Sequence, residues 1–309
     1  MFFLVGGYLA SLPRVNQDSG RINFVLLGIS GNDQKPSDLT DTIFFASFNK
    51  FSGKTFILSL PRDIWLDSLR AKINTAYHYG GFSLVKSSIQ EILGQPVHYI
   101  FVLDFEGFKK IVDFLGGIDI YVERTFDDFK YPIPGKENDE CAGDKEFKCR
   151  FETLHFDAGW EKMNGERALK FVRSRNAEGD EGTDFARNQR QQKFLLAIKD
   201  KISSPQVSLS PSKVLGLVKI LPSLIKTDLR QEEYFNFGLS FLRFDSQRIE
   251  TQLLNGSGPL RPLRSEASSE ASEAGFLYHP IRHSSGQWVL VPKSGNWEKV
   301  KEFVTGEIK

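Results

Sequence analysis

Arginine side chains are concentrated in one short stretch of the sequence, between residues 170 and 192. This stretch, KFVRSRNAEGDEGTDFARNQRQQ, contains four arginines and a central aspartate: Arg173, Arg175, Arg187, Arg190 and Asp184. A guanidinium group is a planar fork of donors that matches the oxygens of phosphate, so the cluster predicts a site for a phosphate-bearing anion. The alternative is a set of surface ion pairs with the acidic residues of the same stretch, which include Asp180 and Glu181.

The flanking patterns indicate how these groups would be positioned. FVRSR is typical of a strand end, on which Arg173 and Arg175 would project from one face because they are two residues apart. TDFARNQRQQKFLLAIKDKI predicts a helix with Thr183 as its N-cap. The loop NAEGDEG would fold the strand end and the helix toward each other, near the free N–H groups of the helix N-terminus.

One face of that helix would carry polar groups. Asp184, Arg187 and Gln191 are spaced i, i+3 and i+7, which places them on a single face. The Arg190 side chain lies off this face, and we expect it at most to support the residues that bind the anion. Phosphate is the ligand that this arrangement fits best.

Acidic and basic residues also stand where predicted strands begin or end. Asp41 follows a polar loop, preceded by Asp33 and Asp38, while Arg62 ends a strand in LPRD and Lys72 follows in AKINTAYHYGG. Carboxylates for a hard cation together with cations for phosphate oxygens are the groups that phosphoryl transfer needs. Each of these residues alone is weak evidence for such a site, because a lone Asp before a strand is commonly a turn former and PRD commonly forms an ion pair in a loop.

The predicted elements form a mixed sheet covered by helices. Three apolar runs, INFVLLGI, TIFFASFN and KTFILSL, predict strands, the last two joined by a turn at Gly53. LVKSSIQEIL predicts a helix that ends at Gly94, followed by the strand VHYIFVL. DFEGFKKIVDFLGG predicts a helix capped by Asp104, and IDIYV a further strand, so the order strand, helix, strand indicates a βαβ unit.

The remainder predicts helical stretches, a Ser/Glu-rich loop at 265–274, an edge strand QWVLVP and a closing helix NWEKVKEFVTG. No linker or repeat divides residues 22–309, which we interpret as one domain. Residues 1–13 are apolar but too short to span a membrane, and we interpret them as the remnant of a transmembrane anchor, with 14–21 as linker. A buried first strand or helix is the alternative.

Composition is that of a folded protein. The chain has 309 residues, of which 40% are hydrophobic and 26% charged, and its net charge of +1 disfavours binding to nucleic acid. The 27 phenylalanines suit a large core and also a pocket for a hydrocarbon chain. Cys141 and Cys149 lie close together in a polar insertion, and we expect a disulfide, in agreement with an extracytoplasmic location.

The order of these motifs resembles the LytR-CpsA-Psr family of membrane-anchored phosphotransferases of the bacterial cell envelope. The matching segments cover 22–202 in the family's order: NFVLLGI, DLTDTIFFASFN, FILSLPRDIWL, KINTAYHYGG, FEGFKKIVDFLGGIDIYV, MNGERALKFVRSR and DFARNQRQQ. The resemblance implies an α/β (α+β) fold with a central mixed sheet flanked by helices, which encloses an apolar channel for a polyprenyl tail.

The resemblance also implies a reaction. A glycopolymer carried on undecaprenyl pyrophosphate would be transferred, with its phosphate, to a hydroxyl of peptidoglycan, at the outer face of the cell membrane. The polymer remains open: teichoic acid, capsule, arabinogalactan or protein-linked glycan. A lipid-pyrophosphate hydrolase and a non-enzymatic sensor or regulator that binds lipid-linked intermediates are the alternatives.

Residue roles follow from the motifs that match. The pyrophosphate would be contacted by six side chains: Arg62, Lys72, Arg173, Arg175, Arg187 and Gln191. Asp184 would position Arg187 or the anion and assist deprotonation of the acceptor hydroxyl, and Asp41 would help to hold Mg²⁺ or Mn²⁺. Many members have an acidic residue in an LLGxD pattern where this chain has Ser30, so either Asp33 or Asp38 replaces that ligand or the metal keeps extra waters.

Overall fold

The structure is a computed structural model that describes residues 20–31, 36–234, 237, 248–254 and 275–309. The expected anchor at 1–13, most of the linker, Asp33 and the Ser/Glu-rich loop lie outside the described residues. Within the described part of the chain, no helix has both the length and the apolar character needed to cross a membrane.

The chain forms two compact units. Unit 1 consists of the described residues within Met1–Ile29, Asp38–Val102 and Lys226–Lys309. Unit 2 consists of those within Ser30–Ser37 and Leu103–Ile225.

The strands and helices follow one another along the chain as β1 (Arg21–Ile29), β2 (Thr40–Asn49), β3 (Thr55–Ser59), β4 (Trp65–Leu66), β5 (Ala71–Lys72), α2 (Ala76–Leu93), β6 (Tyr99–Asp104), α3 (Phe105–Phe114), β7 (Ile118–Val122), β8 (Phe126–Pro132), β9 (Phe151–Phe156), β10 (Gly159–Met163), α4 (Gly165–Arg173), α5 (Asp184–Ser203), α6 (Pro205–Ser208), α7 (Pro211–Leu224), β11 (Ile225–Thr227), β12 (Ile249–Leu253), β13 (Leu277–Tyr278), β14 (Val291–Pro292) and α9 (Glu298–Glu307).

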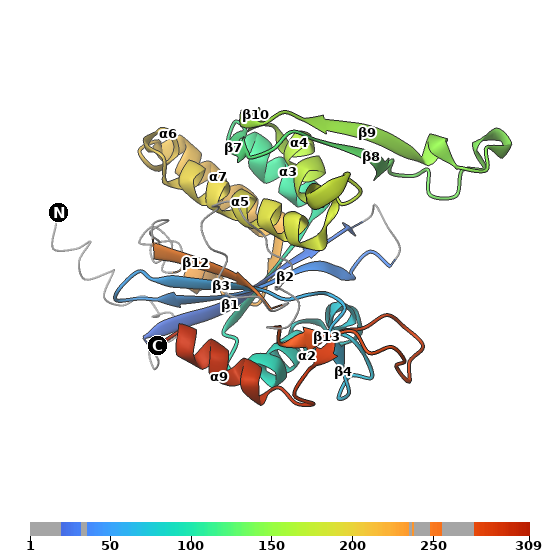
Figure 1. Cartoon of the computed structure of the whole chain (residues 1–309). Coiled ribbons are helices and arrows are strands. Elements are labelled where there is room, and N and C mark those ends of the chain that lie inside the picture. Colours follow the sequence, from blue (N-terminus) through green and yellow to red (C-terminus); the bar gives the residue numbers. More distant parts are fainter. Residues whose placement is uncertain (1–19, 32–35, 235–236, 238–247, 255–274) are drawn as a thin grey trace. The chain divides into compact units, whose positions relative to one another are not determined.

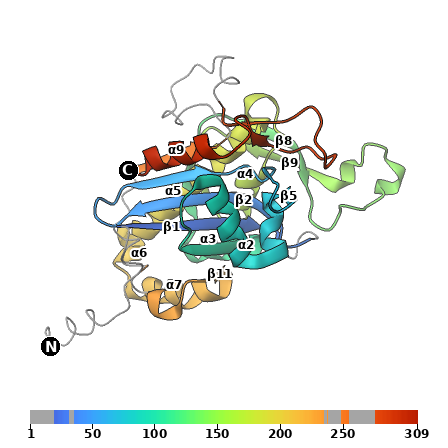
Figure 2. The ribbon, with the colours of Figure 1, turned by 90° about the horizontal axis from the view of Figure 1, so that it is seen from below.

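A mixed sheet with the strand order β11-β6-β1-β2-β3-β12 is the centre of unit 1. β1, β2 and β3 pair antiparallel, whereas β12 pairs parallel with β3, so the predicted mixed sheet flanked by helices is confirmed. Figure 1 shows α2 and α9 on the same face of this sheet, and Figure 2 views the molecule from that side. The central strands read as continuous apolar runs because both of their faces are covered.

Each face of the sheet in unit 1 has its own apolar layer. One layer packs Val25, Phe45 and Leu58 against Ile89 of α2 and Val304 of α9. The opposite face carries aromatic rings. The ring centroid of Phe24 lies 5.9 Å from that of Phe101 and 5.8 Å from that of Phe237, in the edge-to-face geometry that such pairs favour.

Helix α2 is interrupted near its start. Gly80 and Gly81 have non-helical dihedral angles, with φ +56° and ψ −147° at Gly81, a region essentially restricted to glycine. Residues 76–79 and 82–93 are therefore two helical segments joined at a glycine pair. The second segment ends as predicted at Gly94, which has a left-handed conformation and caps the helix.

Unit 2 is built on helices α3, α4, α5 and α7. Asp104 caps α3, as predicted, by accepting a hydrogen bond from Gly107 N. α3 and α4 approach closely at Gly165, where a Cβ atom would lie 2.4 Å from the Lys109 carbonyl oxygen. Glycine at the start of α4 is therefore required by packing.

Two of our predictions for unit 2 are wrong. IDIYV does form β7, but β7 pairs antiparallel with β10 instead of completing a βαβ unit with β6. FVRSR is not a strand end, because residues 165–173 form α4. Asn164 caps α4 by accepting a hydrogen bond from Arg167 N, and the helix buries Ala168, Leu169 and Phe171.

The antiparallel pair of β8 and β9 carries the insertion of residues 133–150 at its end (Figure 1). Cys141 and Cys149 are joined by a disulfide in this insertion, with Cα atoms 5.5 Å apart. The predicted closing helix is α9, whereas QWVLVP contributes only the two-residue β14, paired with β13.

Candidate functional site

Asp41, Arg62, Asp63 and Lys72 form one chain of ion pairs in unit 1. Arg62 Nη1 donates to Asp41 Oδ1 at 2.5 Å, and Arg62 Nε lies 3.6 Å from Asp63 Oδ2. The second oxygen of Asp63 accepts from Lys72 Nζ at 2.7 Å. These side chains are between 22% and 36% exposed, so solvent and a ligand can reach them.

The backbone around these ion pairs is fixed by the ends of short elements. Trp65 pairs with Lys72 in the β4–β5 ladder, and Ile73 N donates to the Ile64 carbonyl oxygen at 2.7 Å. Thr40 Oγ1 donates to the Asn74 carbonyl oxygen at 3.2 Å, which ties the start of β2 to the same turn. The sequence therefore brings Asp41, Arg62 and Lys72 together, as their positions at strand ends predicted.

Asp38 binds a histidine instead of joining that chain. Its Oδ1 lies 2.8 Å from His78 Nδ1, and both side chains are 38% exposed. Burial, and then the charge of Asp38, raise the pKa of the neighbouring Tyr77. The sequence placed Asp63 beside Arg62 in LPRD without giving it a role of its own, whereas His78, in AYHYGG, was not predicted.

Arg173 is held by aromatic rings in unit 2. Its Nη1 donates to Tyr131 Oη at 3.0 Å, and its Cζ lies 4.1 Å from the centre of the Phe105 ring. Cation–π contacts of this kind favour a fixed, charged guanidinium. Burial raises the pKa of Tyr131 to about 12, so its phenol stays protonated at neutral pH.

Arg175 lies on a segment that one buried carboxylate fixes in place. Asp128 is fully buried, and its Oδ2 accepts from Ser174 Oγ at 2.8 Å, from Arg175 N at 3.1 Å and from Asn176 N at 3.3 Å. Among the described residues, the Arg175 side chain is exposed and makes no hydrogen bond or ion pair. The structure therefore holds the backbone of Arg175 while it leaves the guanidinium available.

Arg190 anchors α5 to the segment that precedes it. The residue is 2% exposed, and its guanidinium donates to the Phe171, Ser174 and Glu181 carbonyl oxygens. It also forms an ion pair of 2.8 Å with the Glu181 carboxylate. Burial lowers the pKa of Arg190, and the charge of Glu181 opposes that effect. Arg190 is thus fully engaged by the protein, and its support of anion-binding residues stays a prediction.

Helix α5 contributes the remaining predicted residues. Thr183 caps it, as predicted, by accepting from Ala186 N at 3.1 Å. Asp184 begins the helix, and its side chain lies outside the described part of the structure. Arg187 follows on the same face, whereas Gln191 Nε2 lies 3.5 Å from the Val172 carbonyl oxygen and so approaches α4.

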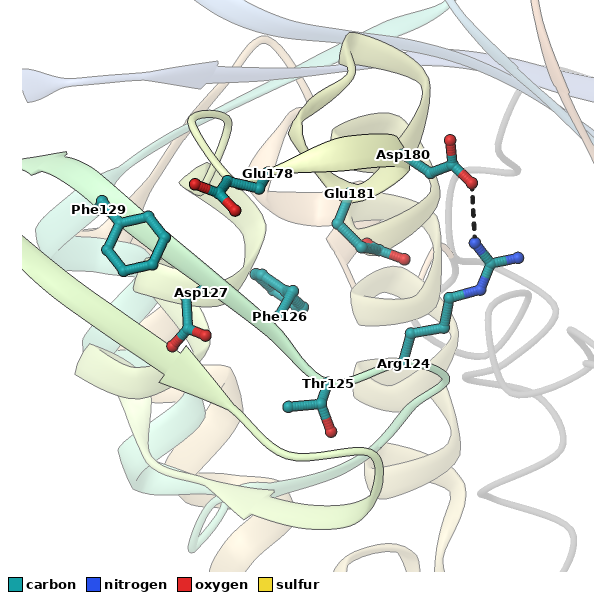
Figure 3. Close-up of a pocket in the computed structure, with 8 residues that line it drawn as sticks. All are labelled: Arg124, Thr125, Phe126, Asp127, Phe129, Glu178, Asp180 and Glu181. Atoms are coloured by element: carbon teal, nitrogen blue, oxygen red, sulfur yellow. Dashed lines mark hydrogen bonds and ion pairs between the residues drawn. The ribbon is translucent and has the colours of Figure 1, made fainter.

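A hollow of about 300 Å³ in unit 2 has eight lining residues, of which four are acidic (Figure 3). The residues that line it are Arg124, Thr125, Phe126, Asp127, Phe129, Glu178, Asp180 and Glu181. Figure 3 shows Arg124 paired with Asp180, at 3.0 Å. Four carboxylates against one guanidinium disfavour an anion, so this hollow is not the phosphate site. Of the ion pairs that were the alternative, the one between Arg190 and Glu181 is present, whereas Asp180 pairs with Arg124, which lies outside the arginine-rich stretch.

The donor set for a metal ion is incomplete in the described residues. There, the only group of three His, Cys, Asp or Glu ligands close enough to share an ion is Asp139, Cys141 and Cys149, and both of its sulfur atoms are in the disulfide. Asp41 has one oxygen that lacks a protein partner in the same part of the chain, and carboxylate oxygen suits Mg²⁺. The described residues therefore offer Asp41 as a single carboxylate ligand for such an ion.

Comparison with known proteins decides the family. The family model described as "LytR_cpsA_psr family" matches residues 10–273. The chain belongs to the LytR-CpsA-Psr family. The resemblance inferred from the motifs is thus confirmed over most of the chain.

Curated relatives include transferases and a regulator. The "Polyisoprenyl-teichoic acid--peptidoglycan teichoic acid transferase TagV" of Bacillus subtilis (strain 168) is 27% identical over 224 residues, which is 71% of this chain and 52% of TagV. "Regulatory protein MsrR" of Staphylococcus aureus (strain COL) is 28% identical over 230 residues, 73% of this chain and 62% of MsrR. The chain therefore spans only about half to three fifths of the length of these relatives.

Solved structures share the fold. The crystal structure of B. subtilis TagV has a TM-score of 0.65 at 23% identity and covers 94% of this chain and 98% of that one. A structure described as TagT bound to LI-WTA has a TM-score of 0.60 at 21% identity, with 96% and 94% covered. The fold is that of LytR-CpsA-Psr proteins.

Proposed function

We propose that this chain transfers a glycopolymer, with its phosphate, from a polyprenyl-pyrophosphate carrier to peptidoglycan. The family and the names of relatives such as TagV support this reaction class. In the reaction, a peptidoglycan hydroxyl oxygen bonds to the phosphorus that carries the glycan. The bond from that phosphorus to the lipid phosphate breaks, polyprenyl phosphate leaves, and the hydroxyl proton passes to a base.

The position of Arg175 is the observation that supports the proposal most directly. A guanidinium without a protein partner in the described chain, on a backbone fixed by Asp128, is a preorganised donor for phosphate oxygens. Arg173, stacked on Phe105 and bonded to Tyr131, would supply a second fixed positive charge. Charge that develops on the departing lipid phosphate would be stabilised by these cations.

Arg62 and Lys72 are the corresponding cations of unit 1. Their assignment, with Arg173, Arg175 and Arg187, to the diphosphate of one substrate rests on the family's motifs. Asp41 would hold Mg²⁺, or Mn²⁺ in its place, with Asp38 or Asp33 as the further carboxylate. When bound, the ion would neutralise charge on the diphosphate.

The remaining assignments are also carried by the motifs. Asp184, at the start of α5, would orient Arg187 and accept the proton of the hydroxyl. Gln191 would donate to the diphosphate only after it leaves the Val172 carbonyl oxygen. The polyprenyl tail would occupy an apolar channel, and the reaction would take place at the outer face of the cell membrane.

Arg175→Ala, assayed with a lipid-linked donor and purified peptidoglycan, tests the proposal. We expect transfer to fall by about 10² to 10³, since that is the usual effect of removing one preorganised donor from a transition state. Arg124→Ala is the matched control, because Arg124 is an exposed arginine of the same unit whose ion pair is 60% and 86% exposed. Both variants should unfold at the denaturant concentration of the parent chain.

The products separate the alternatives. Normal transfer by Arg175→Ala would overturn the assignment of Arg175. Glycan phosphate released into solution, without attachment to peptidoglycan, would identify a lipid-pyrophosphate hydrolase. Donor that stays bound without any turnover would identify a sensor, a reading that the name of MsrR keeps open.

A further inference from the structure

Helix α7 of unit 2 has a buried apolar face and, next to it, an exposed apolar face. Leu217 is 7% exposed and packs in a cluster with Ile111 and Leu115 of α3, and Leu221 and Leu224 lie on the same side. A surface helix normally pairs such a buried stripe with a polar outer face. The outer face of α7 instead presents more apolar side chains.

Four large apolar side chains of the α6–α7 region are exposed to solvent. Leu209 is 78% exposed, Val214 41%, Leu215 59% and Val218 59%. Val214, Leu215 and Val218 share one face of α7 because Val218 is four residues from Val214 and three from Leu215, which places it one turn from both. We call these four residues the α6–α7 face. A grouped exposed patch of this kind indicates a partner, unlike single apolar residues scattered over a surface.

The charges around this face indicate what the partner is. Residues 201–225, KISSPQVSLSPSKVLGLVKILPSLI, contain Lys201, Lys213 and Lys219 and no acidic residue, although the chain as a whole has 39 acidic residues. None of these three lysines makes an ion pair within the described residues. On α7, Lys213 is next to Val214 and Lys219 is next to Val218 and one turn from Leu215. Exposed apolar side chains with unpaired lysines beside them are the pattern of helices that lie in the interface of an anionic membrane.

We propose that unit 2 docks on an anionic phospholipid surface through the α6–α7 face. The four apolar side chains enter the boundary between headgroups and acyl chains, and the lysines contact lipid phosphates. This binding does not depend on the proposed reaction and requires neither donor nor acceptor. Its role would be to hold unit 2 at the surface from which a lipid-linked molecule is taken.

A fluorophore at position 218 tests this contact in the full chain. Cys141 and Cys149 are the only cysteines and are bonded to each other, so a cysteine introduced by Val218→Cys is the one thiol available for a nitrobenzoxadiazole label. Ile281→Cys is the matched control, because Ile281 is 99% exposed and lies in unit 1. Local labels separate docking of this face from any attachment through the apolar N-terminal residues.

With vesicles that contain phosphatidylglycerol, we expect the label at 218 to brighten and shift to shorter wavelength, while the label at 281 stays unchanged. Adding Lys213→Gln and Lys219→Gln to the labelled chain should weaken this response about fivefold per lysine. Adding Leu215→Ser should weaken it at least about threefold. Leu215, Val218 and Lys219 are exposed and Lys213 is half-buried without an ion pair in the described residues, so these changes should leave the unfolding midpoint unchanged.

Three results would each overturn the proposal. The label at 218 could fail to respond although the protein sediments with the vesicles. It could respond equally to vesicles of neutral phosphatidylcholine. It could already report an apolar environment without any vesicle, in which case another part of the chain or a second copy covers the face.

Discussion

Replacement of Arg190 by alanine should destabilise the protein far more than replacement of any exposed arginine. The side chain is 3% exposed, and its guanidinium is the donor for the Phe171 and Ser174 carbonyl oxygens, in residues that are themselves at most 1% exposed. Arg190→Ala leaves both oxygens buried without a donor, and each such group costs about 1 to 3 kcal/mol.

Loss of the ion pair with Glu181 should add less to the destabilisation than loss of the two buried hydrogen bonds. The Glu181 side chain is 22% exposed, so water can replace part of the ion pair after the arginine is removed. The total loss is therefore about 3 to 5 kcal/mol, which is also the usual effect of breaking a buried charge pair from one side. Arg190→Lys keeps the charge but offers a single donor centre, and we expect about half of that loss.

Arg124→Ala provides the comparison within the same unit. Its ion pair with Asp180 is exposed on both sides, so its removal should change the free energy of unfolding by less than about 1 kcal/mol. Urea unfolding followed by near-ultraviolet circular dichroism, with the disulfide intact, measures both variants. Equal midpoints for Arg190→Ala and Arg124→Ala would refute the reasoning that buried, multiply bonded guanidinium is what holds α5 in place.

Two further predictions concern packing and pH. Gly165→Ala should destabilise the protein by roughly 1 to 3 kcal/mol or more, because the new Cβ would lie 2.4 Å from the Lys109 carbonyl oxygen. In α9, the Cβ of Gly306→Ala meets no atom within 4 Å, so this change should stabilise the protein by about 0.5 to 1 kcal/mol. The unfolding midpoints of the two variants test this difference. Burial, together with Lys50 and Lys86, lowers the pKa of His98 below 6.5, and His98 Nδ1 accepts from Asn23 N. The imidazole therefore binds a proton more readily in the unfolded chain, and the free energy of unfolding should fall as pH drops below about 6.5. His98→Gln should lose this part of the pH dependence. If the variant kept the slope of unfolding free energy against pH of the parent chain, this prediction would be wrong.

Local signals in the sequence predicted the elements that have clear ends. The apolar runs of β1, β2 and β3, the caps Asp104 and Thr183 and the stop at Gly94 all lie where the sequence placed them. Each of these features depends on residues within a few positions of one another. The prediction of a strand at FVRSR was wrong because Phe171 and Val172 suggested a strand, whereas the helix begins at the cap Asn164, several residues earlier.

Pairing over long sequence distances could not be predicted in the same way. The partner of β7 is β10, about forty residues later along the chain. The role of Asp128 was hidden by a β-bulge between Asp128 and Tyr131, which turns both side chains inward although strict alternation would place them on opposite faces. Arg62 and Asp41 were more accessible to prediction, because strand ends of one sheet bring them together.

The glycine pair in α2 separates two helical segments that differ in burial. Beyond Gly81, residues such as Ile89 and Leu93 are locked in the interior, whereas His78 and Tyr79 before it face solvent. A Cβ at position 81 would meet no atom within 4 Å, so glycine is needed there for its torsion angles and not for room. The direction of the short turn that bears the histidine partner of Asp38 is accordingly set by the torsion angles at Gly80 and Gly81, and not by the axis of the helix behind it.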